Sequence, residues 1–84
     1  MPKTIFSGDH AHLVAVLVAA RKESGLTQAQ VAAQLGGDQT LVSLIERSQR
    51  RVDVIELIGF AKAIGRDPVE LLAEVVARID AAPQ

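Results

Sequence analysis

The same helix-start signal occurs twice in this chain of 84 residues, and it limits the chain to short helical segments. Thr27 is followed three residues later by Gln30, and Asp53 by Glu56, which is the pattern of a capping box. Glycines that favour helix ends stand between the apolar stretches, at Gly25, Gly36, Gly37 and Gly65. These signals predict five helices, over about residues 9–24, 28–35, 39–47, 54–64 and 68–80.

The composition favours an all-α fold in a single domain. Ala, Leu and Val are abundant, whereas only two residues are aromatic, both of them phenylalanine. We expect an N-terminal arm over residues 1–8, one domain over residues 9–80 with Asp9 as the first helix cap, and a C-terminal tail over residues 81–84. Such a small core, without cysteine for a disulfide, is expected to gain stability from a second subunit.

The charges are spread unevenly along the chain. A net charge of −1 gives no overall basic footprint for nucleic acid, but Arg47, Arg50 and Arg51 lie within five positions. The longest apolar run, residues 13–20, is far shorter than the roughly 20 residues that span a bilayer, and no basic secretion start precedes it. We therefore expect a cytoplasmic protein with one basic end and no membrane contact.

Residues 26–51, LTQAQVAAQLGGDQTLVSLIERSQRR, resemble the Xre family of helix-turn-helix regulators, which includes the lambdoid phage repressors. The family pattern of Leu-Thr-Gln, an apolar-Ala pair, Leu-Gly and Val-Ser-x-Ile-Glu-Arg is matched at Leu26, Thr27, Gln28, Val31, Ala32, Leu35, Gly36, Val42, Ser43, Ile45, Glu46 and Arg47. The resemblance implies a compact five-helix, lambda-repressor-like domain whose second and third helices form the helix-turn-helix. It also implies a sequence-specific, DNA-binding transcriptional regulator of bacterial or phage type, associated with the nucleoid.

The resemblance assigns roles to individual side chains. In such domains the third helix enters the major groove, and the second crosses the phosphate backbone. The residues implied to face base edges are Gln39, Thr40, Ser43 and Leu44. Those implied to contact phosphates are Gln28, Arg47, Arg50 and Arg51. Arg21 and Glu46 match positions that form a structural ion pair in some members of the family.

Two positions depart from the family pattern. Ser48 stands where a glycine usually follows the Glu-Arg pair, and Gly37 stands where the turn usually has an apolar residue. The usual glycine supports a left-handed helix end, which serine adopts only with strain. We therefore expect the helix over residues 39–47 to end differently or to extend, and the turn before it to be looser.

Apolar side chains at helical spacing in the last helix predict a homodimer. The residues expected to meet the partner are Leu72, Val75, Val76 and Ile79. A twofold dimer places two reading helices about 34 Å apart, on successive major grooves of a palindromic operator. The regulator is expected to act as a repressor. Val14, Val16 and Val18 widen the apolar surface of the first helix beyond one core-facing stripe, so part of it is expected to meet another surface.

Other readings of the same fold stay open. An antitoxin would use its apolar surface to cover a toxin while its other face binds DNA. An assembly module would keep the fold and bind no DNA, as the slightly acidic charge permits.

Neither catalysis nor metal binding is indicated. His10 and His12 are two residues apart, so they diverge on a helix, and no histidine lies near Ser43 or Ser48 in the sequence. We expect no enzyme activity and no cofactor.

Overall fold

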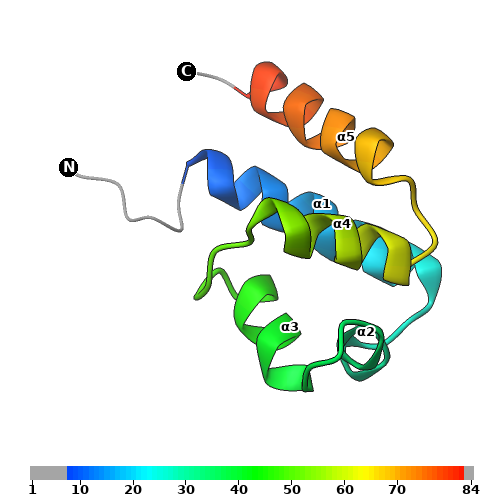
Figure 1. Cartoon of the computed structure of the whole chain (residues 1–84). Helices are drawn as coiled ribbons and strands as arrows, with labels where there is room; N and C mark the ends of the chain where they lie inside the picture. Colours follow the sequence, from blue (N-terminus) through cyan, green and yellow to red (C-terminus); the bar gives the residue numbers. More distant parts are fainter. Residues whose placement is uncertain (1–7, 83–84) are drawn as a thin grey trace.

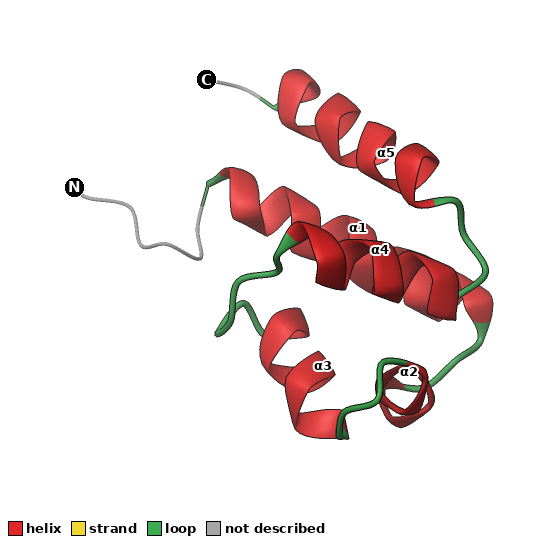
Figure 2. Cartoon of the chain, in the orientation of Figure 1, coloured by secondary structure: helices red, strands yellow, loops and turns green. Residues whose placement is uncertain are grey.

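The computed structural model describes residues 8–82, which form five α-helices and no strand (Figures 1 and 2). The helices are α1 (Asp9–Ser24), α2 (Gln28–Gln34), α3 (Gln39–Glu46), α4 (Val54–Ala63) and α5 (Pro68–Ala81). The all-α prediction is confirmed, and each helix begins and ends within two residues of its predicted position. Most of the expected N-terminal arm and the end of the expected tail lie outside the described residues. No helix among residues 8–82 is long and apolar enough to cross a membrane.

The starts of the helices follow the capping signals with one exception. Both capping boxes form reciprocally, at Thr27 with Gln30 and at Asp53 with Glu56. The exception is α1, whose N-cap is Gly8 and not Asp9. Asp9 is the first residue of α1, where its carboxylate faces the positive end of the helix dipole.

The core forms around α1, which contacts both α3 and α5, while α2 packs against α3 and α4 (Figure 1). The largest fully buried side chains come from all five helices: Leu17, Val31, Val42, Ile45, Phe60 and Leu71. Val14 and Val16 are also buried, so at these two residues the surface that the wide apolar face of α1 meets lies within the domain. A helix with neighbours on several sides needs more than one apolar stripe.

The end of α3 differs from the expectation. Ser48 takes the left-handed conformation, with φ 59°, that glycine usually supplies. The amide of Gln49 donates to the Leu44 carbonyl at 2.8 Å, and the Ser48 amide donates to the Ile45 carbonyl at 3.0 Å. These are the two hydrogen bonds of a Schellman motif, so α3 ends as it would with glycine. The serine makes the same turn and carries the backbone strain.

Candidate nucleic-acid interface

The two faces of α3 differ in chemistry. Val42 and Ile45 point into the core, whereas the opposite face carries polar side chains. A shallow hollow of about 220 Å³ on this face is lined by Gln39, Thr40, Ser43 and Arg47, and we call it the α3 hollow. Three of the four residues expected to face bases therefore lie together on one exposed surface.

Leu44, the fourth expected base contact, lies at the side of this face. It is half-buried and does not line the α3 hollow. Successive residues of a helix are turned by about 100°, which places Leu44 away from Ser43 around the helix axis. An apolar contact by Leu44 with a thymine methyl group stays a prediction.

Arg47 lies closer to the expected base-reading residues than the sequence pattern indicated. Its Nε donates to the Ser43 carbonyl at 3.4 Å, and its side chain lines the α3 hollow. Arg47 follows Thr40 by seven residues, which is close to two helical turns, so both occupy the same face. This periodicity was available in the sequence and could have grouped Arg47 with Thr40.

A chain of hydrogen bonds connects the α3 hollow to α1. Gln39 Nε2 donates to Gln28 Oε1 at 3.4 Å, and Gln28 Nε2 donates to Glu46 Oε1 at 2.9 Å. Glu46 also accepts two hydrogen bonds from Arg21, at 2.6 and 3.0 Å. The structure thus contains the ion pair that the family resemblance implied. The amide of Gln28 is already engaged with two side chains, so its phosphate contact stays a prediction.

The Arg21–Glu46 pair is shielded from solvent. The two side chains are only 12% and 6% exposed. Hydrogen bonding to Glu46 raises the pKa of Arg21, although burial acts in the opposite direction. Arg21 also donates to the Leu26 carbonyl at 2.9 Å. The pair therefore fixes the end of α1, the segment before α2 and the last residue of α3 relative to one another.

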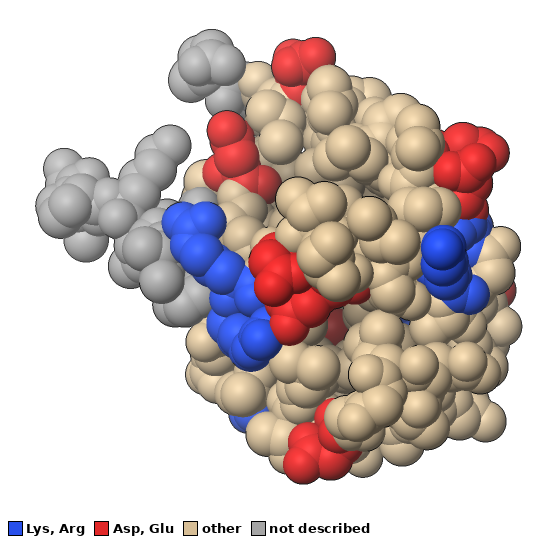
Figure 3. Space-filling view, viewed as in Figure 1, with Lys and Arg blue, Asp and Glu red and all other residues tan. Residues whose placement is uncertain are grey.

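Arg50, another expected phosphate contact, is held by Glu56. Two hydrogen bonds, of 2.8 and 2.7 Å, join the guanidinium to the carboxylate, which also completes the capping box of α4. The hydrogen bonds from Arg50 lower the pKa of Glu56, and those to Glu56 raise the pKa of Arg50. Figure 3 shows basic and acidic side chains side by side near the connection between α3 and α4.

Arg51 is exposed, and its phosphate contact, like that of Arg50, stays a prediction. The ion pair between Arg50 and Glu56 was not predicted. The two residues are six positions apart, on either side of the N-cap of α4, and this spacing could have indicated the pair.

The face of α5 expected to form a dimer is only partly available. Val75 is 5% exposed and belongs to the core, and Ile79 is half-buried against it. Leu72 and Val76 are 47% and 48% exposed. Any contact with a partner therefore centres on Leu72 and Val76, and the dimer itself stays a prediction.

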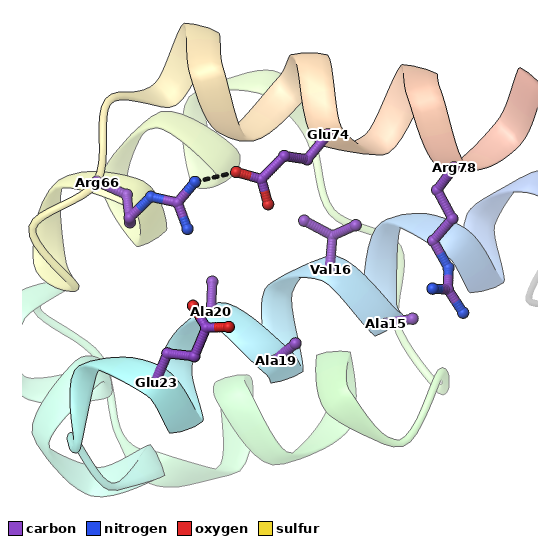
Figure 4. Close-up of a pocket in the computed structure, with 8 residues that line it drawn as sticks. All are labelled: Ala15, Val16, Ala19, Ala20, Glu23, Arg66, Glu74 and Arg78. Carbon is purple, nitrogen blue, oxygen red and sulfur yellow. Dashed lines mark hydrogen bonds and ion pairs between the residues drawn. The ribbon is translucent and has the colours of Figure 1, made fainter.

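A second hollow, of about 270 Å³, lies between α1 and α5 (Figure 4). Its floor consists of small α1 side chains such as Ala15 and Ala19, and an ion pair between Arg66 and Glu74 borders it. The ion pair connects the segment before α5 to the middle of that helix. None of the residues expected to contact DNA lines this hollow.

The two histidines do not form part of a larger ligand cluster. No group of three or more His, Asp or Glu side chains that could hold a metal ion occurs within residues 8–82. Burial, followed by the charge of Arg51, lowers the pKa of His10.

Comparisons with known proteins agree with this geometry. The HTH_3 helix-turn-helix family matches residues 17–71, which include α2, α3 and α4. The chain is 44% identical over 52 residues to the "Uncharacterized HTH-type transcriptional regulator y4dJ" of Sinorhizobium fredii, which covers 62% of this chain and 68% of that protein. An "XRE-family like protein" from Pseudomonas syringae superposes with a TM-score of 0.78 at 42% identity, covering 82% of this chain and 84% of the other.

These matches confirm the family resemblance, and they place the chain in a DNA-binding class of regulators that is not enzymatic. The chain belongs to the Xre-type helix-turn-helix family of DNA-binding transcriptional regulators.

Proposed function

We propose that this regulator reads a palindromic operator as a dimer, with the α3 hollow of each protomer in a major groove, and that it acts as a repressor. The observation that carries the proposal is the cluster of hydrogen-bonding side chains on the outer face of α3. Gln39, Thr40 and Arg47 are exposed and Ser43 is half-buried, and none of them belongs to the buried core, so this face can meet base edges.

Gln39 is the central candidate for base recognition. A glutamine amide both donates and accepts, which matches the N6 and N7 edge of adenine. Its contact with Gln28, which is itself bonded to Glu46, favours one orientation of this amide before DNA arrives. A preoriented side chain loses less conformational freedom on binding, and this lowers the cost of recognition.

Thr40, Ser43 and Arg47 extend the recognition surface. Hydroxyl groups pair with several base edges, whereas a guanidinium that reaches a base prefers the two acceptors of guanine. Arg47, which lines the α3 hollow, can alternatively bind a phosphate, the role implied for it by the family resemblance. Arg51, exposed after α3, is proposed to bind a flanking phosphate.

The proposal is tested by selecting binding sites from random DNA duplexes with the full chain. The wild type is expected to enrich a palindrome, and Gln39→Ala is expected to relax the preference at one base pair in each half-site. Gln34→Ala, an exposed glutamine at the end of α2, serves as the matched control and should leave the enriched sequence unchanged.

A salt series separates base contacts from phosphate contacts. Arg51→Ala is expected to weaken binding to all duplexes and to lower the slope of log affinity against log salt by about one. Enrichment of no sequence at low salt would overturn the proposed operator recognition. Enrichment of an asymmetric half-site alone would overturn the dimer while retaining base recognition.

A further inference from the structure

The arginines of the described residues fall into two groups. Carboxylates hold three of them: Arg21, Arg50 and Arg66. The others form no ion pair with a described residue: Arg47, Arg51 and Arg78. Within this second group, only Arg47 lines the α3 hollow. Its guanidinium is therefore a cation without a carboxylate partner on the surface proposed to meet DNA.

Arg47 shares the sector of α3 that carries the other candidate base contacts. The Arg47 amide still donates to the Ser43 carbonyl at 3.0 Å, as in an α-helix, so its side chain leaves the axis at a helical position. At about 100° per residue, one arc of about 100° holds all the residues that line the α3 hollow: Gln39, Thr40, Ser43 and Arg47. Arg47 lies inside this arc, between Ser43 and Thr40, and not at its edge.

The Arg47 side chain is folded back along α3. Its Nε donates to the Ser43 carbonyl, one turn earlier, at 3.4 Å. The two terminal nitrogens, Nη1 and Nη2, make no hydrogen bond with a described residue. Two parallel N–H donors on one planar group match the O6 and N7 acceptors of guanine in the major groove. A phosphate accepts such a pair as well, but phosphates lie along the walls of the groove and base edges form its floor.

The helix α3 is short enough for both of its ends to reach bases. Its eight residues span about 12 Å, which is about the width of the major groove. Arg47 follows Gln39 by eight residues, so about 12 Å also separates these two residues along the helix axis. Base pairs are about 3.4 Å apart, so a helix that follows the groove places Arg47 about three to four base pairs from Gln39.

We propose that Arg47 reads a base, and that each half-site of the operator carries a guanine about three to four base pairs from the adenine that Gln39 reads. The inference rests on the proposed operator recognition and names a second base pair of the target. It replaces the phosphate contact that the family resemblance implies for Arg47. The flanking phosphate is left to Arg51, which is exposed and lies beyond the end of α3.

Two arginine variants test this assignment on the sequence that the wild type selects. Arg47→Ala is expected to lower the preference for guanine at one base pair of each half-site by about 5- to 150-fold, with the other positions unchanged. Arg51→Ala is the matched control, which should weaken binding to all duplexes and lower the slope of log affinity against log salt by about one. Both side chains are exposed, so circular dichroism should show unchanged folding.

A modified base tests the contact atom by atom. Replacing guanine with 7-deazaguanine removes the N7 acceptor and keeps the Watson–Crick pair. At the proposed position this replacement should weaken binding by the wild type about tenfold, and it should leave binding by Arg47→Ala unchanged. Inosine keeps O6 and N7 and lacks only the amino group in the minor groove, so the wild type should bind it as it binds guanine.

Three outcomes would refute the inference and leave the proposed regulator in place. The first is a selected palindrome without guanine at about three to four base pairs from the position that Gln39→Ala relaxes. The second is an Arg47→Ala variant that weakens all duplexes equally and lowers the salt slope by about one, as a phosphate contact would. The third is an equal loss from 7-deazaguanine in the wild type and in Arg47→Ala. Enrichment of no sequence would instead overturn the proposed function, and this inference with it.

Discussion

The end of α3 allows backbone strain to be measured by exchanging residues between two equivalent turns. The α4 end has the same two Schellman hydrogen bonds as the α3 end, from Arg66 to Ala61 at 2.8 Å and from Gly65 to Lys62 at 3.1 Å. The left-handed residue is Gly65 there, with φ 75°. Ser48 is the corresponding residue at the end of α3.

The magnitude follows from the conformation of Ser48. A residue other than glycine in the left-handed region costs about 1–2 kcal/mol, and glycine costs about 0.5–1 kcal/mol more than other residues to order on folding. Ser48→Gly should therefore raise the free energy of unfolding by about 0.5–1 kcal/mol, which is about 2–8 °C in Tm for a domain of this size. The Ser48 hydroxyl makes no hydrogen bond with the described residues, so its removal costs little.

Gly65→Ser is the reciprocal variant. A Cβ atom at Gly65 would meet no other group within 4 Å, so its effect isolates the backbone conformation. We expect it to destabilise the protein by about 0.5–1 kcal/mol, and urea unfolding with thermal melts followed by circular dichroism measures both variants. If Ser48→Gly is neutral or destabilising while Gly65→Ser destabilises, the assignment of strain to Ser48 is refuted.

Three further predictions concern the ion pairs. Glu46→Gln should lower the free energy of unfolding by about 3 kcal/mol in urea, because Arg21 is left with a buried, uncompensated charge, and a loss below about 0.5 kcal/mol would contradict this. The lowered pKa of Glu56 should add stability that is present above its ordinary value of 4.5 and is lost as the pH falls through its folded-state pKa. Stability measured from pH 7 downward should thus fall less steeply in Glu56→Gln than in the wild type, and equal slopes would exclude this contribution. Arg66→Ala should change stability by less than about 1 kcal/mol, because its pair with Glu74 is exposed, and a loss as large as that of Glu46→Gln would be unexpected.

Helix boundaries were predictable because they depend on neighbouring residues. A capping box joins residues three apart, so Thr27 and Gln30 define the start of α2 without reference to the rest of the chain. Gly25 and Gly65 mark helix ends for the same reason, since a left-handed turn is local. The fold class followed from these boundaries and the family resemblance.

Other features depended on packing between distant segments. Val16 lies outside the single apolar stripe with which α1 would pack against one neighbour. In the structure α1 has neighbours on several sides, and Val16 is buried. Gln28 looked free to meet a phosphate, yet the fold brings Glu46 to its amide from 18 positions away. Val75 shares the periodicity of Leu72 and Val76, and periodicity does not distinguish a core residue from one that faces a partner.

The two faces of α3 have a consequence for how such regulators diverge. Val42, Ile45 and Glu46 hold the helix in place, whereas Gln39 and Thr40 are exposed. Exposed helix positions tolerate exchange at little cost to stability. New operator preferences can therefore arise by substitution on the outer face while the inner face is inherited unchanged. Duplicated copies of such a gene can in this way come to control different promoters while each copy keeps the same core and the same fold.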